Sequence, residues 1–342
     1  MKTKNKKTKK QRKLLLALLM LLLTFITLST STYAWFTANK TVTVSTINVN
    51  VAAANGLQIS VDGLEWKAVI TNEDILKTIG EQSTYPTNTN QLPSLSTNLS
   101  PVSTVGTIDS TGKMEMFLGE VGSDALGNYQ LTATKSTETK SNNSGHFIVF
   151  DLFFQVQEQT DIYLTENAKI TYGTKDGGTD SGIQNAARVA FINEGNTPAG
   201  STGTVIQGLV NADAQPVIWE PNYDVHTAAA VAHAKNTYNV DTQQAGATKL
   251  TYFGLKSAIA QPVALNNTDE AYFAQVNPTI ATPAAGIGAD AYQKAFTLNA
   301  GISKIRVYMW VEGQDVDCEN MASGGQIAFD LQFSSNKNSS GA

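Results

Sequence analysis

The chain has 342 residues, of which 42% are apolar and 15% charged, and it contains one cysteine and three histidines. A chain of this length buries a large core without covalent help, and a single cysteine excludes an intrachain disulfide scaffold. So few cysteines and histidines also argue against a structural zinc site of the usual nitrogen and sulfur type.

Charge is divided unevenly along the chain. Residues 1–34 contain eight of the 24 basic residues and no acidic residue, which leaves 16 basic and 29 acidic residues and a net charge of −13 in the remainder. A surface this acidic repels nucleic-acid phosphates and anionic lipid head groups. The sequence therefore predicts that nucleic acid is not a partner.

The N-terminus has the order of an export signal. Basic residues from Lys2 to Lys13 precede an apolar run from Leu14 to Leu28, and a small polar stretch then leads to Tyr33 and Ala34. This order predicts a secretory signal peptide over residues 1–34, removed by a signal peptidase during export. The alternative is a retained membrane anchor, although the apolar run is shorter than the roughly twenty residues that span a bilayer.

The residues around the expected cleavage point carry a family resemblance. The segment Thr32–Thr37 reads Thr-Tyr-Ala-Trp-Phe-Thr. It resembles the junction in substrates of the SipW-type signal peptidase of Gram-positive bacteria, which include the TasA/camelysin family of biofilm-matrix fibre proteins. The resemblance is confined to this junction and the strand after it, and it implies a secreted extracellular-matrix protein that forms fibres.

A β-prone strand follows the junction. Its apolar residues lie in one register at first and in the other register afterwards, which predicts a β-bulge between the two groups. A free N-terminal strand can complete its own sheet or add to the edge of a neighbour's sheet. The resemblance implies the second mode, and the residues that would be donated are Val42, Val44, Ile47, Val49 and Val51.

Period-two alternation dominates the rest of the chain and predicts strands. The clearest runs lie at residues 305–311 and 327–333, and the turn-rich segment 313–325 between them predicts an antiparallel pair. The run at 148–156 is apolar on both faces, which predicts a central strand between layers.

Weaker patterns complete the organisation. Shorter strands are predicted at 57–61, 64–69, 161–164 and 187–192, short helices at 72–79, 227–236 and 290–296, and polar loops at 81–110 and 134–145. Together these elements predict an all-β fold, an antiparallel β-sandwich with small helical insertions. The more specific expectation of a jelly roll comes partly from the family resemblance. The sandwich is expected over 35–195 and 299–336, with an insertion or subdomain of mixed structure at 196–298 and a polar tail at 337–342.

One acidic loop is a candidate metal site. Asp315, Asp317 and Glu319 occur at alternate positions after the predicted strand 305–311. Calcium prefers several carboxylate and carbonyl oxygens from one loop, so these residues are candidate Ca²⁺ ligands. The alternative is a solvated loop in which aspartates form turns, with no cofactor at all.

Other reactive residues give weaker signals. Cys318 has acidic neighbours that disfavour its thiolate, so no reactive thiol is expected. His226 and His233 have no visible third ligand or orienting partner and are expected at the surface.

The sequence has no recognisable nucleophile, zinc-protease or phosphate-loop motif, which argues against an enzyme. Dispersed glycosidase carboxylates stay open as an alternative.

Exposed aromatic residues would suit a glycan. Tyr308 and Trp310 share the face of their strand opposite its core residues, and Trp219 is a third candidate. Aromatic rings on a flat β surface stack on sugar rings. The alternative is that a second layer covers them, because large aromatic residues are mostly buried.

Two functions follow from these patterns. The leading hypothesis is a secreted, non-enzymatic protein of the cell surface or extracellular matrix that associates with itself, by donation of the strand after the signal. The alternative is a glycan-binding surface module that uses the exposed aromatic residues.

Overall fold

The computed structural model describes twelve stretches of the chain. They are residues 42–52, 57–79, 83–91, 98–138, 146–165, 167–173, 180–222, 225–238, 252–264, 269–276, 294–318 and 324–335. The predicted signal peptide and the predicted polar tail lie outside these stretches. Among the described residues, no helix has the length and apolar character needed to cross a membrane.

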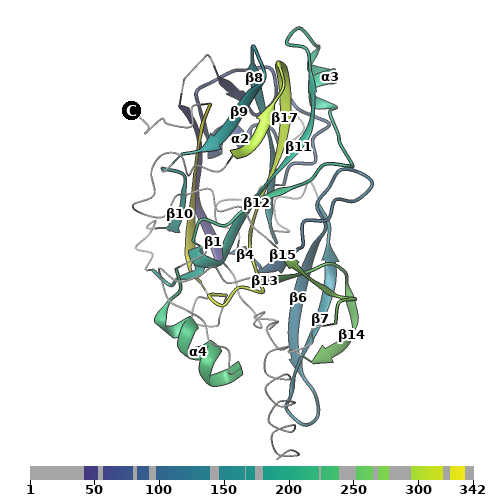
Figure 1. Cartoon of the computed structure of the whole chain (residues 1–342), viewed down its shortest axis with the longest axis vertical. Helices are drawn as coiled ribbons and strands as arrows, with labels where there is room; N and C mark the ends of the chain where they lie inside the picture. The colour runs from purple at the N-terminus through teal and green to yellow at the C-terminus, as the bar shows by residue number, and fades with distance from the viewer. Residues whose placement is uncertain are drawn as a thin grey trace, which may run out of the picture.

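Two large sheets form the body of the molecule (Figure 1). The seven-stranded sheet has the order β16 (Lys294–Leu298), β9 (Thr160–Leu164), β18 (Gln326–Ser334), β1 (Val42–Ala52) and β3 (Val69–Thr71), with β10 (Lys169–Tyr172) also paired to β18 and β4 (Asn98–Leu99) to β1. The five-stranded sheet has the order β12 (Val217–Trp219), β11 (Ala187–Thr197), β17 (Gly301–Val311), β8 (Ile148–Val156) and β2 (Gln58–Ser60). The all-β sandwich fold is confirmed.

The main core lies between these two sheets. Alternate residues of β1 and β18 form one side, and alternate residues of β8, β11 and β17 form the other. Phe154 and Phe191 of the five-stranded sheet meet Phe296 and Phe333 of the seven-stranded sheet, with ring centroids 5.4–5.8 Å apart. Edge-to-face packing of this kind adds to the burial energy of the rings, so this cluster ties the two layers together.

A third layer covers the outer face of the five-stranded sheet. It contains a four-stranded sheet of β14 (Ile259–Ala264), β7 (Tyr129–Ser136), β6 (Met116–Ser123) and β5 (Val102–Ser103), and a pair of β13 (Tyr252–Leu255) and β15 (Phe273–Val276). Figure 1 shows β6, β7 and β14 projecting at the lower right. Because this layer packs on β8 and β17, both faces of those strands are buried. The predicted central position of residues 148–156 is confirmed.

The predicted pairing of residues 305–311 with 327–333 is wrong. β17 belongs to the five-stranded sheet, where its neighbours are β11 and β8, whereas β18 lies in the seven-stranded sheet. The two strands face each other across the core, and the segment between them crosses from one layer to the other. Each strand buries its apolar face against the other strand's sheet. Alternation shows only which face of a strand is buried, so it does not distinguish strands that pair side by side from strands that face each other across a core.

One strand pair is parallel. β1 pairs in parallel with β18 from Thr43 to Ala52, while β9 and β10 pair with β18 in the antiparallel sense. Parallel neighbours require a long connection, and here nearly the whole chain separates the two strands. The sandwich is therefore mixed at this point, whereas jelly rolls are antiparallel architectures.

The smaller elements agree with the sequence in most places. Helices form at α2 (Asn72–Leu76) and α4 (Ala228–Tyr238), as predicted. Two further short helices are the 3₁₀-helix η2 (Ile183–Ala186) and the α-helix α3 (Gly203–Gln207). Residues 294–296 of the predicted third helix instead belong to strand β16. The predicted strand at 64–69 is largely a turn, because the Asp62 carboxylate accepts hydrogen bonds from the backbone N–H groups of Leu64 and Glu65.

The predicted insertion at 196–298 contributes to both main sheets. Its strand β12 pairs with β11, and its strand β16 pairs with β9. The same region also supplies β13, β14 and β15 to the covering layer. Segments far apart in the sequence thus build each layer together.

Candidate functional site

The strand after the predicted signal lies inside its own sheet. β1 has β18 on one side and the short strands β3 and β4 on the other. A register shift between Val44 and Thr46 confirms the predicted bulge. The residues predicted for donation are at most 7% exposed, and they are Val42, Val44, Ile47, Val49 and Val51. The single chain thus uses this strand to complete its own sheet.

The partners of β1 are unequal. Its pairing with β18 runs from Thr43 to Ala52, whereas β3 covers only Asn48–Asn50 and β4 only Val42 and Thr43. Two side chains of β1 also donate hydrogen bonds to β18. Ser45 Oγ donates to the Ile327 carbonyl at 3.2 Å, and Asn50 Nδ2 donates to Asp330 Oδ1 at 3.3 Å. The strand is therefore held mainly by β18 and by its own buried apolar side chains.

The three aromatic residues predicted to stack on a glycan are buried. Tyr308, Trp310 and Trp219 are each 0% exposed, so none presents a ring to a ligand. Tyr308 and Trp310 lie beneath the covering layer, while Trp219 belongs to the core between the two main sheets. The prediction of a shared stacking surface is wrong, because the covering layer packs over Tyr308 and Trp310 and the main core encloses Trp219.

The acidic loop after β17 turns inward. Asp315 and Asp317 are 6% and 1% exposed, and Glu319 lies outside the described residues. Asp315 accepts a hydrogen bond from Arg188, and its other oxygen accepts one from the backbone N–H of Asp317 at 2.8 Å. These two aspartates are not solvated, but the predicted turn is present, since the Asp315 side chain accepts a hydrogen bond from the backbone two residues later. A calcium site that includes Glu319 stays a prediction.

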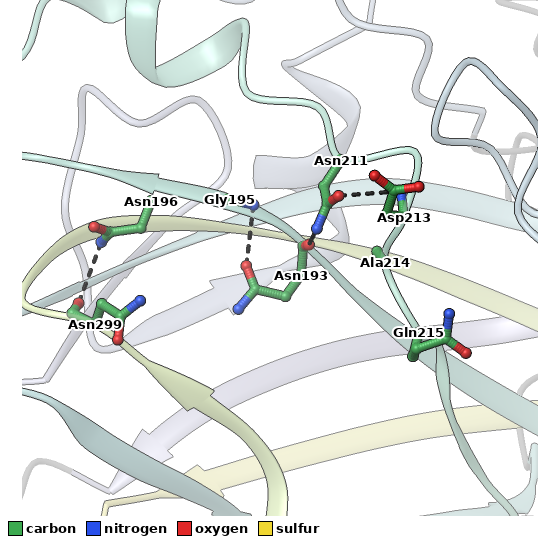
Figure 2. A pocket seen from close by; sticks show the side chains of 8 residues that line it. All are labelled: Asn193, Gly195, Asn196, Asn211, Asp213, Ala214, Gln215 and Asn299. Carbon is green, nitrogen blue, oxygen red and sulfur yellow. Dashed lines mark hydrogen bonds between the residues drawn. The ribbon is translucent and has the colours of Figure 1, made fainter.

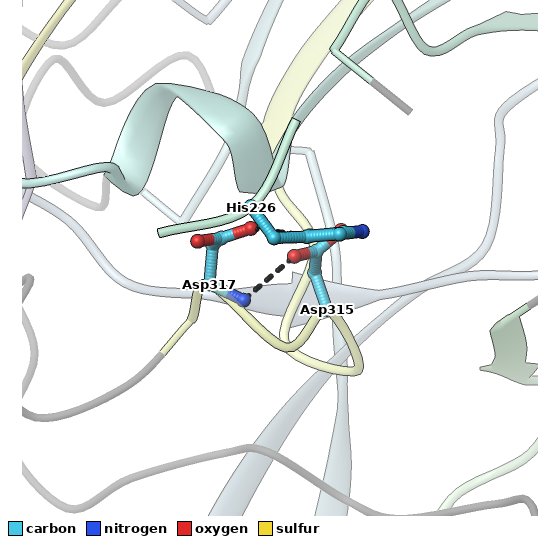
Figure 3. A group of neighbouring side chains, drawn as sticks. All are labelled: His226, Asp315 and Asp317. Atoms are coloured by element: carbon cyan, nitrogen blue, oxygen red, sulfur yellow. Dashed lines mark hydrogen bonds and ion pairs between the residues drawn. The ribbon is translucent and has the colours of Figure 1, made fainter. Parts of the chain in front are cut away.

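A histidine joins the two aspartates. His226 Nδ1 lies 2.7 Å from Asp317 Oδ2, and its side chain is 5% exposed, so the expectation of a surface position is wrong (Figure 3). Burial alone would lower the pKa of His226, but the hydrogen bond to Asp317 and the charge of Asp315 raise it overall. One potential ligand atom from each of His226, Asp315 and Asp317 lies within 4.8 Å of the other two.

A second buried ionic cluster lies between the five-stranded sheet and its cover. Arg306 Nη1 lies 2.8 Å from Asp151 Oδ1, and Arg306 Nη2 lies 2.6 Å from Glu138 Oε2. Lys304 Nζ lies 3.7 Å from Asp151 Oδ2, and the Tyr85 hydroxyl donates to the same oxygen at 3.0 Å. Sequence reasoning missed this cluster, although charged residues inside an apolar alternation are a signal of a buried polar layer.

A polar pocket of about 350 Å³ opens beside the end of β11 (Figure 2). A register shift between Asn193 and Gly195 forms a bulge there, and the Gly195 N–H donates to Asn193 Oδ1 at 3.0 Å. The Asn211 side chain contacts the Asn193 carbonyl at 3.4 Å. The lining residues are Asn193, Gly195, Asn196, Asn211, Asp213, Ala214, Gln215 and Asn299. Several of these amides are thus used to shape the pocket wall itself.

The bulge turns Glu194 into the protein, and this gives a testable pH dependence. Burial raises the pKa of Glu194 to about 7, against the opposing hydrogen bond from the Asn211 N–H. The folded state retains the Glu194 proton to higher pH than the unfolded state. The stabilisation of the folded state by this proton is therefore complete below about pH 4.5 and is lost as pH rises to about 7. We expect Glu194→Gln to be more stable than the wild type at pH 8 by about 3 kcal/mol and equal to it at pH 4. Urea unfolding at both pH values checks this, and an equal difference at both would contradict it.

Comparison with known proteins gives no relative for this chain. No family model, curated protein or solved structure matches it. The function of this chain is therefore inferred from its own residues and their geometry.

Proposed function

We propose that this chain is a secreted, non-enzymatic structural protein of the cell surface or extracellular matrix, which assembles into fibres by exchange of β1 between neighbouring copies. The signal peptidase acts on it during export, and other copies of the same chain are its partners. The segment Thr32–Thr37, with its resemblance to the fibre-forming TasA/camelysin family, supports export and assembly. The acidic remainder of the chain supports a location away from nucleic acids and anionic lipids.

The placement of β1 is the observation that carries this proposal. It is the first described element of the chain, and it inserts five buried apolar residues beside the last strand, β18. A terminal strand leaves one copy and enters another without threading the rest of the chain. An identical strand from a neighbour makes the same contacts, so exchange costs little in packing energy.

The direction of exchange determines the assembly. If each copy donates β1 forward and receives β1 from behind, the contact is heterologous and repeats into an open filament. Reciprocal exchange between two copies gives a closed dimer instead. Exchange of β1 breaks mainly its ladder with β18 and re-forms that ladder with β18 of the neighbouring copy, because β3 and β4 contribute only short ladders.

Electron microscopy of the purified protein tests this proposal. The chain that begins at Trp35 is expected to form filaments, and the same chain without residues 35–46 is expected to lose them. A chain without residues 337–342 is the matched truncation and is expected to form filaments as the parent does. Monomers in all three preparations would contradict fibre formation. Retention of the protein inside intact cells, shown by protection from added protease, would contradict export.

A further inference from the structure

The His226–Asp315–Asp317 cluster joins two segments that are distant in the sequence. Asp315 and Asp317 lie in the loop after β17, while His226 lies just before α4. The Thr227 N–H donates to Asp317 Oδ1 at 2.9 Å, which fixes the approach of the histidine. Figure 3 shows the His226 side chain next to the side chains of Asp315 and Asp317.

We propose that His226, Asp315 and Asp317 bind a divalent transition-metal ion, with Zn²⁺ as the representative ion. One ligand atom from each residue lies within 4.8 Å of the other two. Zinc binds imidazole nitrogen and carboxylate oxygen at about 2.0–2.2 Å, so two ligands of one ion lie roughly 3.3 Å apart in tetrahedral geometry. To reach that spacing, the His226 and Asp317 atoms, which lie 2.7 Å apart, must separate, and the wider pairs in the cluster must approach. Three protein ligands leave one position for water.

The ligand set distinguishes this site from a calcium site. Calcium takes six to eight oxygen ligands, whereas imidazole nitrogen suits zinc and its transition-metal neighbours. In the described structure His226 Nδ1 and Asp317 Oδ2 lie 2.7 Å apart, at the distance of a hydrogen bond with one proton between them. A metal ion replaces that proton, because both atoms bind it in their deprotonated forms.

Charge in the surroundings also favours a cation. Asp315, Asp317 and Glu220 bring three carboxylates into one buried region, and Arg188 contacts two of them, Asp315 and Glu220. Asp317 has His226 and the Thr227 N–H as its donors. With a neutral imidazole, the single positive charge of Arg188 and the two positive charges of a divalent ion equal the three negative charges of these carboxylates. Buried charges are retained in proteins when they are paired or bound to metal.

Metal binding would join the loop after β17 to the segment before α4. The loop after β17 extends the central strand of the five-stranded sheet, and the segment at His226 leads into α4. An ion that binds only the folded arrangement stabilises it by mass action. This role is independent of β1 exchange, since no residue of β1 belongs to the cluster.

Calorimetric titration of the untagged, EDTA-treated chain that begins at Trp35 tests the proposal. We expect one equivalent of ZnCl₂ to bind, CaCl₂ to bind at least tenfold more weakly, and the melting temperature to rise with Zn²⁺ and return with EDTA. His226→Ala and Asp317→Asn are expected to weaken Zn²⁺ binding at least tenfold. His233→Ala changes a histidine of α4 outside the cluster and is the matched control, expected to bind as the wild type does.

Histidine NMR on the wild type keeps the test decisive if a variant fails to fold. Addition of Zn²⁺ is expected to shift the imidazole signal of His226 and to leave those of His146 and His233 in place. Absence of stoichiometric Zn²⁺ binding would overturn the proposal. Binding that persists in a folded His226→Ala variant, or a preference for Ca²⁺, would overturn it as well.

Discussion

A chain that begins at residue 53 is expected to be unfolded or aggregated. Such a chain lacks β1, whose five buried apolar residues face the main core between the two sheets. Each buried side chain of this type contributes roughly 1.5–3 kcal/mol, so their joint loss is on the order of 10 kcal/mol. That value is comparable to the whole stability of a typical protein, about 5–15 kcal/mol. Far-UV circular dichroism and size-exclusion chromatography measure the outcome.

A separate peptide with the sequence of β1 is expected to restore folding of the truncated chain. A synthetic peptide of residues 42–52, added during refolding, should restore a soluble folded complex, because its contacts with β18 do not depend on a covalent link. The matched control peptide carries Ile47→Asp and Val49→Asp, which place charges at positions at most 1% exposed. Equal rescue by both peptides, or a truncated chain that folds alone, would contradict the assigned role of β1.

Loss of the buried guanidinium of Arg306 is expected to have the second largest effect. Arg306 is 4% exposed and contacts Asp151 at 2.8 Å and Glu138 at 2.6 Å. Removing one member of a buried ionic cluster leaves the remaining charges poorly compensated and costs about 3–5 kcal/mol. We expect Arg306→Met to lower the melting temperature by roughly 10 °C, as measured by differential scanning calorimetry.

A surface pair provides the control for this substitution. Lys135 contacts Glu115 at 2.6 Å, and their side chains are 39% and 23% exposed. Exposed ion pairs contribute about 0–1 kcal/mol, so Lys135→Met is expected to change the melting temperature by only a few degrees. If Arg306→Met were no more destabilising than Lys135→Met, the prediction that the buried ionic cluster depends on Arg306 would be wrong.

Strand positions were predictable from alternation, but strand partners were not. The runs at 148–156, 305–311 and 327–333 all form strands with their apolar residues in the core. The sequence carries no comparable signal for pairing between elements hundreds of residues apart. The parallel contact of β1 with β18 and the separation of β17 from β18 depend on long-range packing, which local patterns do not encode.

In the candidate sites, too, local features were predictable from the sequence and tertiary contacts were not. The bulge in β1 was visible as a change of register between Val44 and Ile47, because a one-residue insertion shifts every later side chain to the other face. Burial of Trp310 depends on the covering layer, which other parts of the chain contribute. The partnership of His226 with Asp317 is likewise tertiary, since 91 positions separate the two residues.

A disulfide cross-link between β1 and β18 tests strand exchange most directly. Asn48 and Asp330 are Cα partners in the parallel pair, so Asn48→Cys and Asp330→Cys together place two thiols on neighbouring strands. Oxidised monomers are expected to contain an intrachain bond and to migrate as single chains under denaturing, non-reducing conditions. Oxidised filaments are expected to give a ladder of covalently joined chains. Filaments that release only single, internally cross-linked chains would contradict the exchange of β1.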